Sequence, residues 1–256
     1  MTGKKGSAPD PARSLALLWG PQTRPGRSGV TVRSIVTAAL ELADTEGLDA
    51  VSMRAVAERL KVGTMTLYTH VPGRSELTDL MLDSIYGELY ADVAEPSRQP
   101  GGWRGAMEFV ARRNWEVMDA HPWMHELNVG RTGFGPNSTL RYEAELRPLD
   151  GLGLTDVEMD SALALVLSHV EFVARQAAAH RRTQQESGQT DEEWWVSTAP
   201  LLERVMAGSA EAFPLAARVG TSAGQEHRAL LAPDHALAFG LARILDGLAL
   251  LIDSRA

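Results

Sequence analysis

The stretch of sequence that decides the fold is residues 52–71, SMRAVAERLKVGTMTLYTHV. Ser52 is a typical helix-capping residue, and apolar residues follow it at helical spacing as far as Leu60. Residues 61–63 interrupt this periodicity, and a second short helical pattern covers residues 64–70. The pattern predicts two short helices joined by a tight turn that contains glycine, which is a helix-turn-helix.

The sizes of three side chains fit a close crossing of these two helices. Ala57 is small enough for close approach, Val62 can fill the turn, and Leu67 can anchor the second helix to the core. Thr64 and Thr66 then remain on the outer face. In a helix-turn-helix this face enters the major groove of DNA.

The flanking sequence completes a three-helix head. A helix expected over residues 31–46, capped by Thr31, precedes the pair. Pro72 and Gly73 end the last helix of the pair. A longer helix then begins at residue 74 and is expected to reach residue 93. We therefore expect a DNA-binding domain over residues 29–76.

Residues 77–256 are expected to form an entirely helical body. The expected helices cover residues 103–120, a short segment from residue 122, and residues 137–146, 155–183, 192–207 and 234–253. Polar residues 184–191 and a loose, glycine-rich connection up to residue 233 separate the last three. No strand-like alternation competes with this pattern, so the predicted fold class is all-α.

Residues 1–28 contain Pro, Gly, Ser and basic residues without periodicity, and we interpret them as a flexible basic arm. Two interpretations stay open for this arm. It is either a disordered tail or a segment that lies along a DNA groove or backbone.

Composition excludes several classes of protein. The chain has no cysteine, which excludes disulfides, thiol redox sensing and cysteine-bound zinc. The formal net charge of −8 is unevenly distributed: residues 1–78 carry ten Lys or Arg and seven Asp or Glu, and the remainder carries fifteen and twenty-six. This asymmetry gives weak support to nucleic-acid binding. With no membrane span or secretory signal recognised, we expect a cytoplasmic protein.

Enzyme function has no support in the sequence. The chain contains no phosphate-cradling glycine motif, no Gly-x-Ser-x-Gly and no cysteine nucleophile. His121 and His125 stand four residues apart, but Pro122 lies between them and no third ligand is evident. We therefore expect no catalytic residue, no metal and no cofactor.

Residues 52–71 resemble the signature of the TetR family of transcriptional regulators, and the resemblance extends over roughly residues 31–82. Within it, Thr66 to Val71 look like the recognition helix of the family. The resemblance implies a homodimeric repressor that binds a palindromic operator and releases it when a small hydrophobic or amphipathic molecule binds the body.

The resemblance also implies a set of DNA contacts. Hydroxyl groups and the helix start suit phosphates, Met65 suits a thymine methyl, and Arg54 suits a phosphate or a guanine. The expected DNA-binding residues are Ser52, Arg54, Thr64, Met65, Thr66, Tyr68, His70 and Arg74. Two departures from the common pattern are Gly63 at the helix cap and Pro72-Gly73 in place of a lysine-rich turn.

In this family the effector binds among helices of the body, and two long apolar helices form the dimer interface. Here the expected helices over residues 155–183 and 234–253 suit that interface, with Gly240 and Gly247 allowing close approach. The expected effector-binding residues are Tyr86, Tyr90, Val110, Asn114, Met118, His125, Asn128, Phe134, His169, Phe172 and Gln176. The alternative is that many of these residues belong to the core.

Two further interpretations remain open at this stage. One is a helical interaction protein that has lost DNA binding, although Arg54, Thr66 and Tyr68 argue against it. The other is an activator, or a regulator without a ligand. The effector, the operator sequence and the regulated genes are not encoded in any recognisable pattern.

Overall fold

The computed structural model describes residues 11–24, 29–127, 134–207, 212–229 and 231–255, and in this part of the chain every regular element is a helix. The α-helices are α1 (Pro11–Leu18), α2 (Val32–Glu46), α3 (Met53–Arg59), α4 (Thr64–Tyr68), α5 (Arg74–Tyr86), α6 (Gly102–Ala120), α7 (Pro136–Leu146), α8 (Asp156–Ser187), α9 (Asp191–Ala207), α10 (Pro214–His227) and α11 (Pro233–Asp253). The 3-10 helices are η1 (Leu48–Ala50), η2 (Pro96–Arg98), η3 (Pro122–Glu126) and η4 (Arg147–Leu149). The predicted all-α fold class is confirmed.

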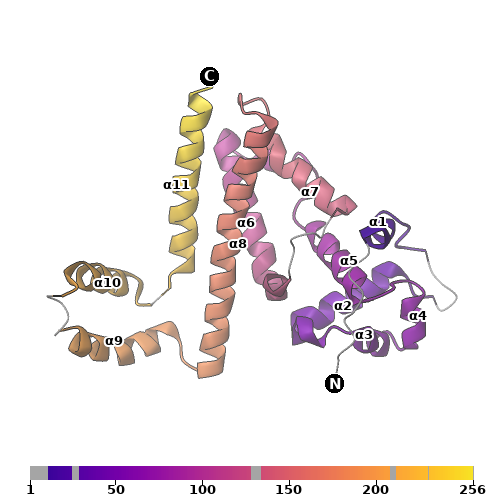
Figure 1. The fold of residues 1–256 in the computed structure, drawn as a ribbon, viewed down its shortest axis with the longest axis horizontal. Helices are drawn as coiled ribbons and strands as arrows, with labels where there is room; N and C mark the ends of the chain where they lie inside the picture. Colours follow the sequence, from indigo (N-terminus) through magenta and orange to yellow (C-terminus); the bar gives the residue numbers. More distant parts are fainter. Residues whose placement is uncertain (1–10, 25–28, 128–133, 208–211, 230, 256) are drawn as a thin grey trace.

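Helices α1 to α5 form the head, drawn in indigo and purple in Figure 1. The core of the head is apolar, and Ile35, Ala39, Val56 and Leu67 have no exposed surface. Thr31 begins α2 with a reciprocal capping box, which satisfies backbone N–H groups that have no partner within the helix. The helix-turn-helix of α3 and α4 forms where the sequence predicts it.

The interpretation of residues 1–28 as a flexible arm was wrong for residues 11–18, which form α1. Leu18 is buried in the head core, and the Ser14 hydroxyl donates a hydrogen bond of 2.5 Å to Asp79 on α5. A helix of eight residues is marginal by itself, so contacts with α5 rather than local propensity stabilise it. Residues 1–10 and 25–28 lie outside the described chain.

Helix α5 ends at Tyr86, seven residues earlier than predicted. The N–H of Gly87 bonds back to the carbonyl of Asp83, and the chain then turns. Side chains stabilise this turn, because Glu95 accepts from the N–H of Ala91 at 2.6 Å. Apolar spacing alone did not reveal these side-chain hydrogen bonds.

The body is built on α8, which lies against α6 on one side and α11 on the other (Figure 1). Thr155 and Glu158 form a capping box at the start of α8. Val166 and Val170 on α8 and Leu245 on α11 are completely buried, so these helices share one apolar core. That core positions α5 and α7 around the candidate site.

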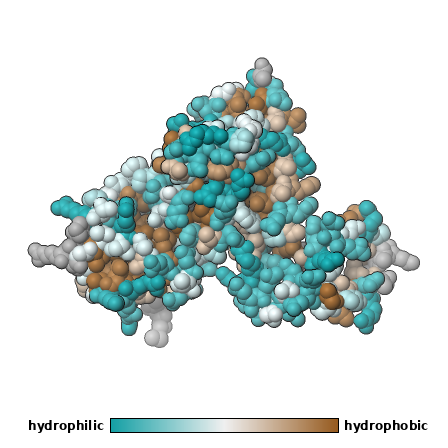
Figure 2. All heavy atoms as spheres, turned by 180° about the vertical axis from the view of Figure 1, so that it is seen from behind, coloured by the Kyte–Doolittle hydropathy of each residue, from teal (hydrophilic) through white to brown (hydrophobic). Residues whose placement is uncertain are grey.

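Helices α9 and α10 form a helical hairpin that projects away from the lower end of α8 (Figure 1). The expectation of a loose connection was wrong for residues 214–227, which form α10. The glycines that suggested a loop have another role at Gly224, where any Cβ would overlap the ring of Trp195 on α9. In the view of Figure 2 this part of the surface is mainly hydrophilic, with a few small apolar spots.

Within the described residues, one helix is long and apolar enough to cross a membrane by length and composition alone. This helix is α11, which the sequence analysis did not count as a span. Only 11% of its most apolar window is buried in the single chain, because one face packs on α8 and α6 while the other faces solvent.

Candidate functional site

The outer side of the head begins at the first turn of α3. Ser52 accepts a hydrogen bond of 3.1 Å from the N–H of Ala55, so its own hydroxyl hydrogen can still reach an external acceptor. The Arg54 side chain is 83% exposed and pairs with Glu58 at 2.8 Å. A phosphate would therefore compete with Glu58 for this guanidinium.

Helix α4 presents its polar and long side chains outward. Leu67 is completely buried and fixes the helix on the head core, whereas Met65 is 76% exposed and Tyr68 is 45% exposed. Thr64 and Thr66 are partly exposed. The exposed part of α4 can therefore enter a groove of a partner molecule without rearrangement of the core.

His70 and Arg74 lie beyond the end of α4 and differ in how they are held. His70 is partly exposed, and its backbone N–H bonds to the carbonyl of Leu67. The Arg74 guanidinium donates to the carbonyl of Leu48 at 2.9 Å, which ties the start of α5 to η1. Arg74 thus has a structural contact that the sequence did not indicate.

A buried polar cluster lies inside the body, centred on Glu145 of α7. This side chain is 1% exposed, and its Oε1 accepts hydrogen bonds from the Tyr90 hydroxyl at 3.0 Å, Asn114 Nδ2 at 2.7 Å and Arg141 Nε at 3.0 Å. Burial, and next the charge of Glu145, raises the pKa of Tyr90. Tyr90 is therefore a neutral hydrogen-bond donor at physiological pH.

Arg141 brings a positive charge into this cluster. Its guanidinium carbon lies 4.4 Å from the ring centre of Tyr86, which is a cation–π contact. Burial disfavours the charged form of Arg141, but Glu145 and then Tyr86 outweigh it, and the net effect raises the pKa of Arg141. Burial also raises the pKa of Tyr86. The Arg141–Glu145 pair contributes no net charge.

A cavity of about 620 Å³ opens beside this cluster between α5, α7 and α8. Its lining residues are Tyr86, Phe134, Ser138, Thr139, Arg141, Tyr142, Glu145 and Leu167. This mixture of aromatic surface with a few convergent polar groups is typical of a small-molecule site. We refer to it as the chamber. A second cavity, of about 430 Å³, lies where α8 meets α9 and contains none of the predicted effector residues.

Several of the predicted effector residues lie in or directly behind the chamber. Tyr86 and Phe134 line it, and Tyr90 and Asn114 bind the same oxygen of Glu145. Val110 is completely buried one turn from Asn114. The partly buried Met118 packs against the core.

The three predicted residues of α8 do not line the chamber. His169 turns toward α11, where its Nε2 lies 3.2 Å from the carbonyl oxygen of Leu237 and its ring covers Gly240. Phe172 is 62% exposed and Gln176 is exposed. The inward stripe of α8 is the one that helical spacing predicts, and it consists of Leu163, Val166, Val170 and Val173. The assignment of the other three to an effector site came from the family resemblance and not from this spacing. Asn128, a further predicted effector residue, lies outside the described residues.

The two histidines with metal-like spacing have separate roles. His121 Nδ1 lies 2.7 Å from Asp44 Oδ1 on α2, which also accepts from the indole N–H of Trp123 at 2.7 Å. His125 is partly buried, its Nε2 has no hydrogen-bond partner in the described chain, and burial lowers its pKa. Among the described residues no three metal-ligating side chains come together.

Three polar contacts connect the head to the segments around the chamber. The first is Asp44 with His121. In the second, Asp83 of α5 accepts from the N–H of Ser138 at 2.9 Å, at the start of α7. In the third, the Trp19 indole donates to the carbonyl of Phe134 at 2.8 Å. Two of these contacts end on residues that line the chamber.

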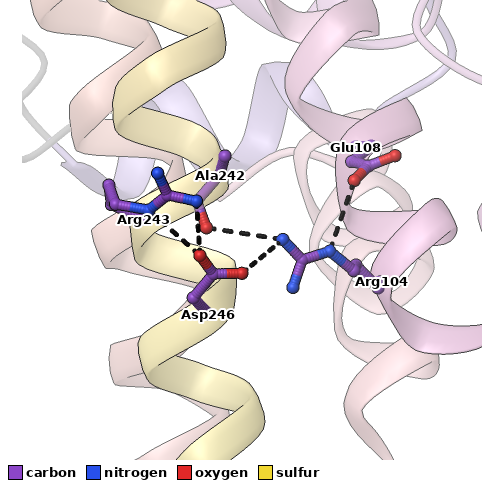
Figure 3. Close-up of polar contacts among 5 residues, drawn as sticks. All are labelled: Arg104, Glu108, Ala242, Arg243 and Asp246. Carbon is purple, nitrogen blue, oxygen red and sulfur yellow. Dashed lines mark hydrogen bonds and ion pairs between the residues drawn. The ribbon is translucent and has the colours of Figure 1, made fainter.

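A further polar contact fixes α11 to α6 at the far side of the body (Figure 3). Arg104 donates to Asp246 at 2.7 Å and lies 3.6 Å from Glu108, and Arg243 donates to the other oxygen of Asp246. Arg104, and then Arg243, holds the pKa of Asp246 below its usual range. This network ties α11 to α6 at one point, beside the buried Leu245 of α11.

The sequence analysis missed most of the polar residues of the chamber. Arg141 and Glu145 stand four residues apart, a spacing that is typical of a solvated helix pair. The neighbouring Tyr142 is exposed, so α7 has a mixed pattern without a clear inward stripe. One signal was available in the sequence. Tyr90 and Asn114 are each a polar residue in a segment whose other residues have apolar helical spacing.

Comparison with known proteins gives concordant matches. The family model for bacterial regulatory proteins of the tetR family matches residues 35–80, and that for the tetracyclin repressor-like C-terminal domain matches residues 95–252. The transcriptional repressor DrrR1 of Streptomyces coeruleorubidus is 38% identical over 99% of this chain and 93% of its own length. ActR of Streptomyces coelicolor, solved with (S)-DNPA, has a TM-score of 0.68 and 27% identity over 86% of this chain and 97% of its own. The complex of ActR with actinorhodin has a TM-score of 0.67 and 28% identity, covering 86% of this chain and 95% of its own.

Proposed function

We propose a mechanism of operator binding and release for this chain. The chain belongs to the TetR family and is a transcriptional repressor with a ligand-binding C-terminal domain, not an enzyme. In this mechanism residues 29–76 bind a palindromic operator in the cytoplasm, and residues 77–256 bind an effector and dimerise. The observation that carries the proposal is the chamber itself, because contacts from its walls reach α5 and α1 of the head.

The exposed side of α3 and α4 is the proposed DNA-binding surface. Thr64, Met65 and Thr66 would face base edges, while Ser52, Tyr68 and His70 would bind phosphates. Arg54 would exchange Glu58 for a phosphate or a guanine. Arg74 would bind DNA only through the guanidinium N–H groups that do not donate to the carbonyl of Leu48.

The proposed homodimer covers the exposed faces of α8 and α11. Leu165 and Phe172 on α8 and Phe239 and Leu250 on α11 are at least half exposed in the single chain. Because α8 and α11 pack side by side, we propose that these residues belong to one apolar surface. A second copy would cover it and place two heads at half-sites 34–36 Å apart or a multiple of that distance.

The chamber suits a small hydrophobic or amphipathic effector. Tyr86 and Phe134 offer flat apolar surface, and Ser138, Thr139 and Arg141 offer hydrogen-bonding groups. The Arg141–Glu145 pair is neutral as a unit, so the site does not demand a charged ligand. ActR, with the same fold, is a relative solved with small molecules bound.

Operator release would follow from movement of the chamber walls. An effector that presses on Phe134 or Ser138 acts on segments bonded to Trp19 and Asp83. Such movement tilts α5 and changes the spacing between the two heads. For release, the effector must bind the DNA-incompetent state more tightly than the competent one.

The first test is binding to the DNA that flanks the gene of this protein, measured by fluorescence anisotropy at several salt concentrations. We expect salt-dependent binding of two protomers per palindrome, strongly weakened in Tyr68→Ala and Thr66→Val. Val205→Ala, at a side chain on α9 that is 73% exposed, is the control. Equal binding to random duplex by all variants would favour the helical interaction protein instead.

The second test addresses release. A panel of hydrophobic and amphipathic molecules is first screened for compounds that raise the melting temperature of the protein. These compounds are then added to the preformed protein–DNA complex, and we expect them to dissociate it. Leu167→Trp, which fills the chamber, should bind DNA normally and resist release. Val196→Trp, at an exposed position on α9, is the matched control. Release of both variants by the same compound would place the effector elsewhere.

A further inference from the structure

Lys61, in the turn between α3 and α4, has a backbone conformation that its residue type disfavours. Its φ of 57° lies in the left-handed region, which only one other non-glycine residue of the described chain, Arg228, enters. A Cβ in this region clashes with the following carbonyl, so non-glycine residues other than Asn and Asp adopt it rarely.

The geometry of the turn requires the left-handed conformation but not a lysine. The N–H of Lys61 bonds to the carbonyl of Glu58 at 3.1 Å, and the N–H of Val62 bonds to that of Ala57 at 3.0 Å. Both bonds use backbone atoms only. Glycine would make the same turn without strain, so the fold does not explain why this position carries a side chain.

The charge of Lys61 is not neutralised within the head, unlike the charges of the two arginines on α3. Arg54 pairs with Glu58 at 2.8 Å and Arg59 pairs with Glu41 at 3.0 Å. Lys61 is exposed, and no carboxylate of the described chain lies within ion-pair distance of it. Its ammonium is therefore available to an external anion, unlike the guanidinium groups of Arg54 and Arg59 on α3.

The choice of lysine adds a further observation. The chain has three lysines, Lys4, Lys5 and Lys61, and all its other permanently charged cations are arginines. Lysine carries a compact point charge on a flexible stem, which suits a single phosphate oxygen better than planar, bidentate recognition.

We propose that Lys61 binds a phosphate of the operator backbone at the edge of the major groove that α4 enters. This inference rests on the proposed function of the head, because Lys61 lies three residues before Thr64 and on the exposed side of the same turn. The strained conformation fixes where the lysine stem leaves the turn. Lys61 thereby supplies a cation that the Pro72-Gly73 turn lacks.

The decisive variant is Lys61→Gly, which removes both the charge and the strain. We expect its melting temperature to rise by roughly 2–4 °C while its operator affinity falls about tenfold. The slope of log affinity against log salt should become shallower by about 1.8 for a dimer that loses two phosphate contacts. Lys61→Arg keeps the charge and should keep the salt slope. Arg112→Gln, which removes an exposed charge on α6, should change neither the affinity nor the slope.

A footprint on the unaltered protein gives an independent readout. Acetylation by a lysine-reactive ester, followed by mass spectrometry, reports on Lys61 separately from Lys4 and Lys5. We expect operator DNA to slow acetylation of Lys61 at low salt, and this protection to vanish at a salt concentration that dissociates the complex.

The outcomes separate this inference from the function on which it rests. If the unaltered protein binds no duplex specifically, the proposed function fails. If it binds its operator, but Lys61→Gly retains the full salt slope and Lys61 reacts equally with and without DNA, then the phosphate contact alone is refuted.

Discussion

In helices α2 to α4 of the head, the buried side chains are apolar, such as Ile35, Val56 and Leu67. The buried polar side chains of the head lie on α1 and α5, and are Ser14, Glu76, Asp79 and Asp83. In the body, Glu145 and Asn114 are as deeply buried, and three hydrogen bonds converge on one carboxylate oxygen. The helix-turn-helix thus has its polar groups on its surface. The body holds its polar cluster inside, beside the chamber. This difference also determines how each region responds to substitution.

The largest expected effect is in the body. Glu145→Ala removes the shared acceptor and leaves the charge of Arg141 buried without its counterion, so we expect the free energy of unfolding to fall by about 3–5 kcal/mol. Urea unfolding followed by circular dichroism measures it. Glu145→Gln keeps an acceptor and should lose less. A loss below 1 kcal/mol in the alanine variant would mean that the cluster is hydrated, and the contrast with the head would disappear.

In the head, core and surface should separate cleanly. Leu67→Ala leaves a cavity and should lower the free energy of unfolding by about 3 kcal/mol. Met65→Ala, two residues away and 76% exposed, should change stability by less than about 0.5 kcal/mol and yet weaken DNA binding. Urea midpoints and anisotropy on the same preparations test both variants. Equal destabilisation by the two substitutions would show that α4 has no free outer face.

The smallest effect is expected within the head, where α5 packs against α1. Burial raises the pKa of Asp79, despite the opposing hydrogen bond from Ser14. The folded protein therefore binds a proton more readily than the unfolded chain at this site. The contribution of Asp79 to stability then falls as pH rises from its unfolded pKa through the raised folded pKa.

Asp79→Asn removes that ionisation while keeping an acceptor for Ser14. We expect the variant to gain stability relative to the unaltered protein at pH 7.5 and to lose this advantage as pH is lowered toward 4, with a difference on the order of 1 kcal/mol or less. Urea midpoints across this range test it, and Ser14→Ala controls for the hydrogen bond. An advantage that grew as pH fell would reverse the assigned direction of the shift.

The head was predictable because its information is local. The cap at Ser52, the small Ala57 and the anchor Leu67 specify two helices and their crossing within sixteen residues. Neither α1 nor α10 was predictable in this way. Helix α1 depends on Asp79 and the head core, and α10 depends on a glycine that fits beneath Trp195.

The chamber marks the limit of sequence reasoning. By itself the sequence determined the helical class, the helix-turn-helix and the residues on its outer face, since each follows from a period of 3.6 residues and from cap and turn chemistry. Only the tertiary structure decided that Arg141 and Glu145 lie inside and that His169 faces α11. The physical reason is that burial of a polar residue depends on partners distant in the sequence. Glu145 is stable inside the protein because Tyr90 and Asn114, from other segments, donate to it.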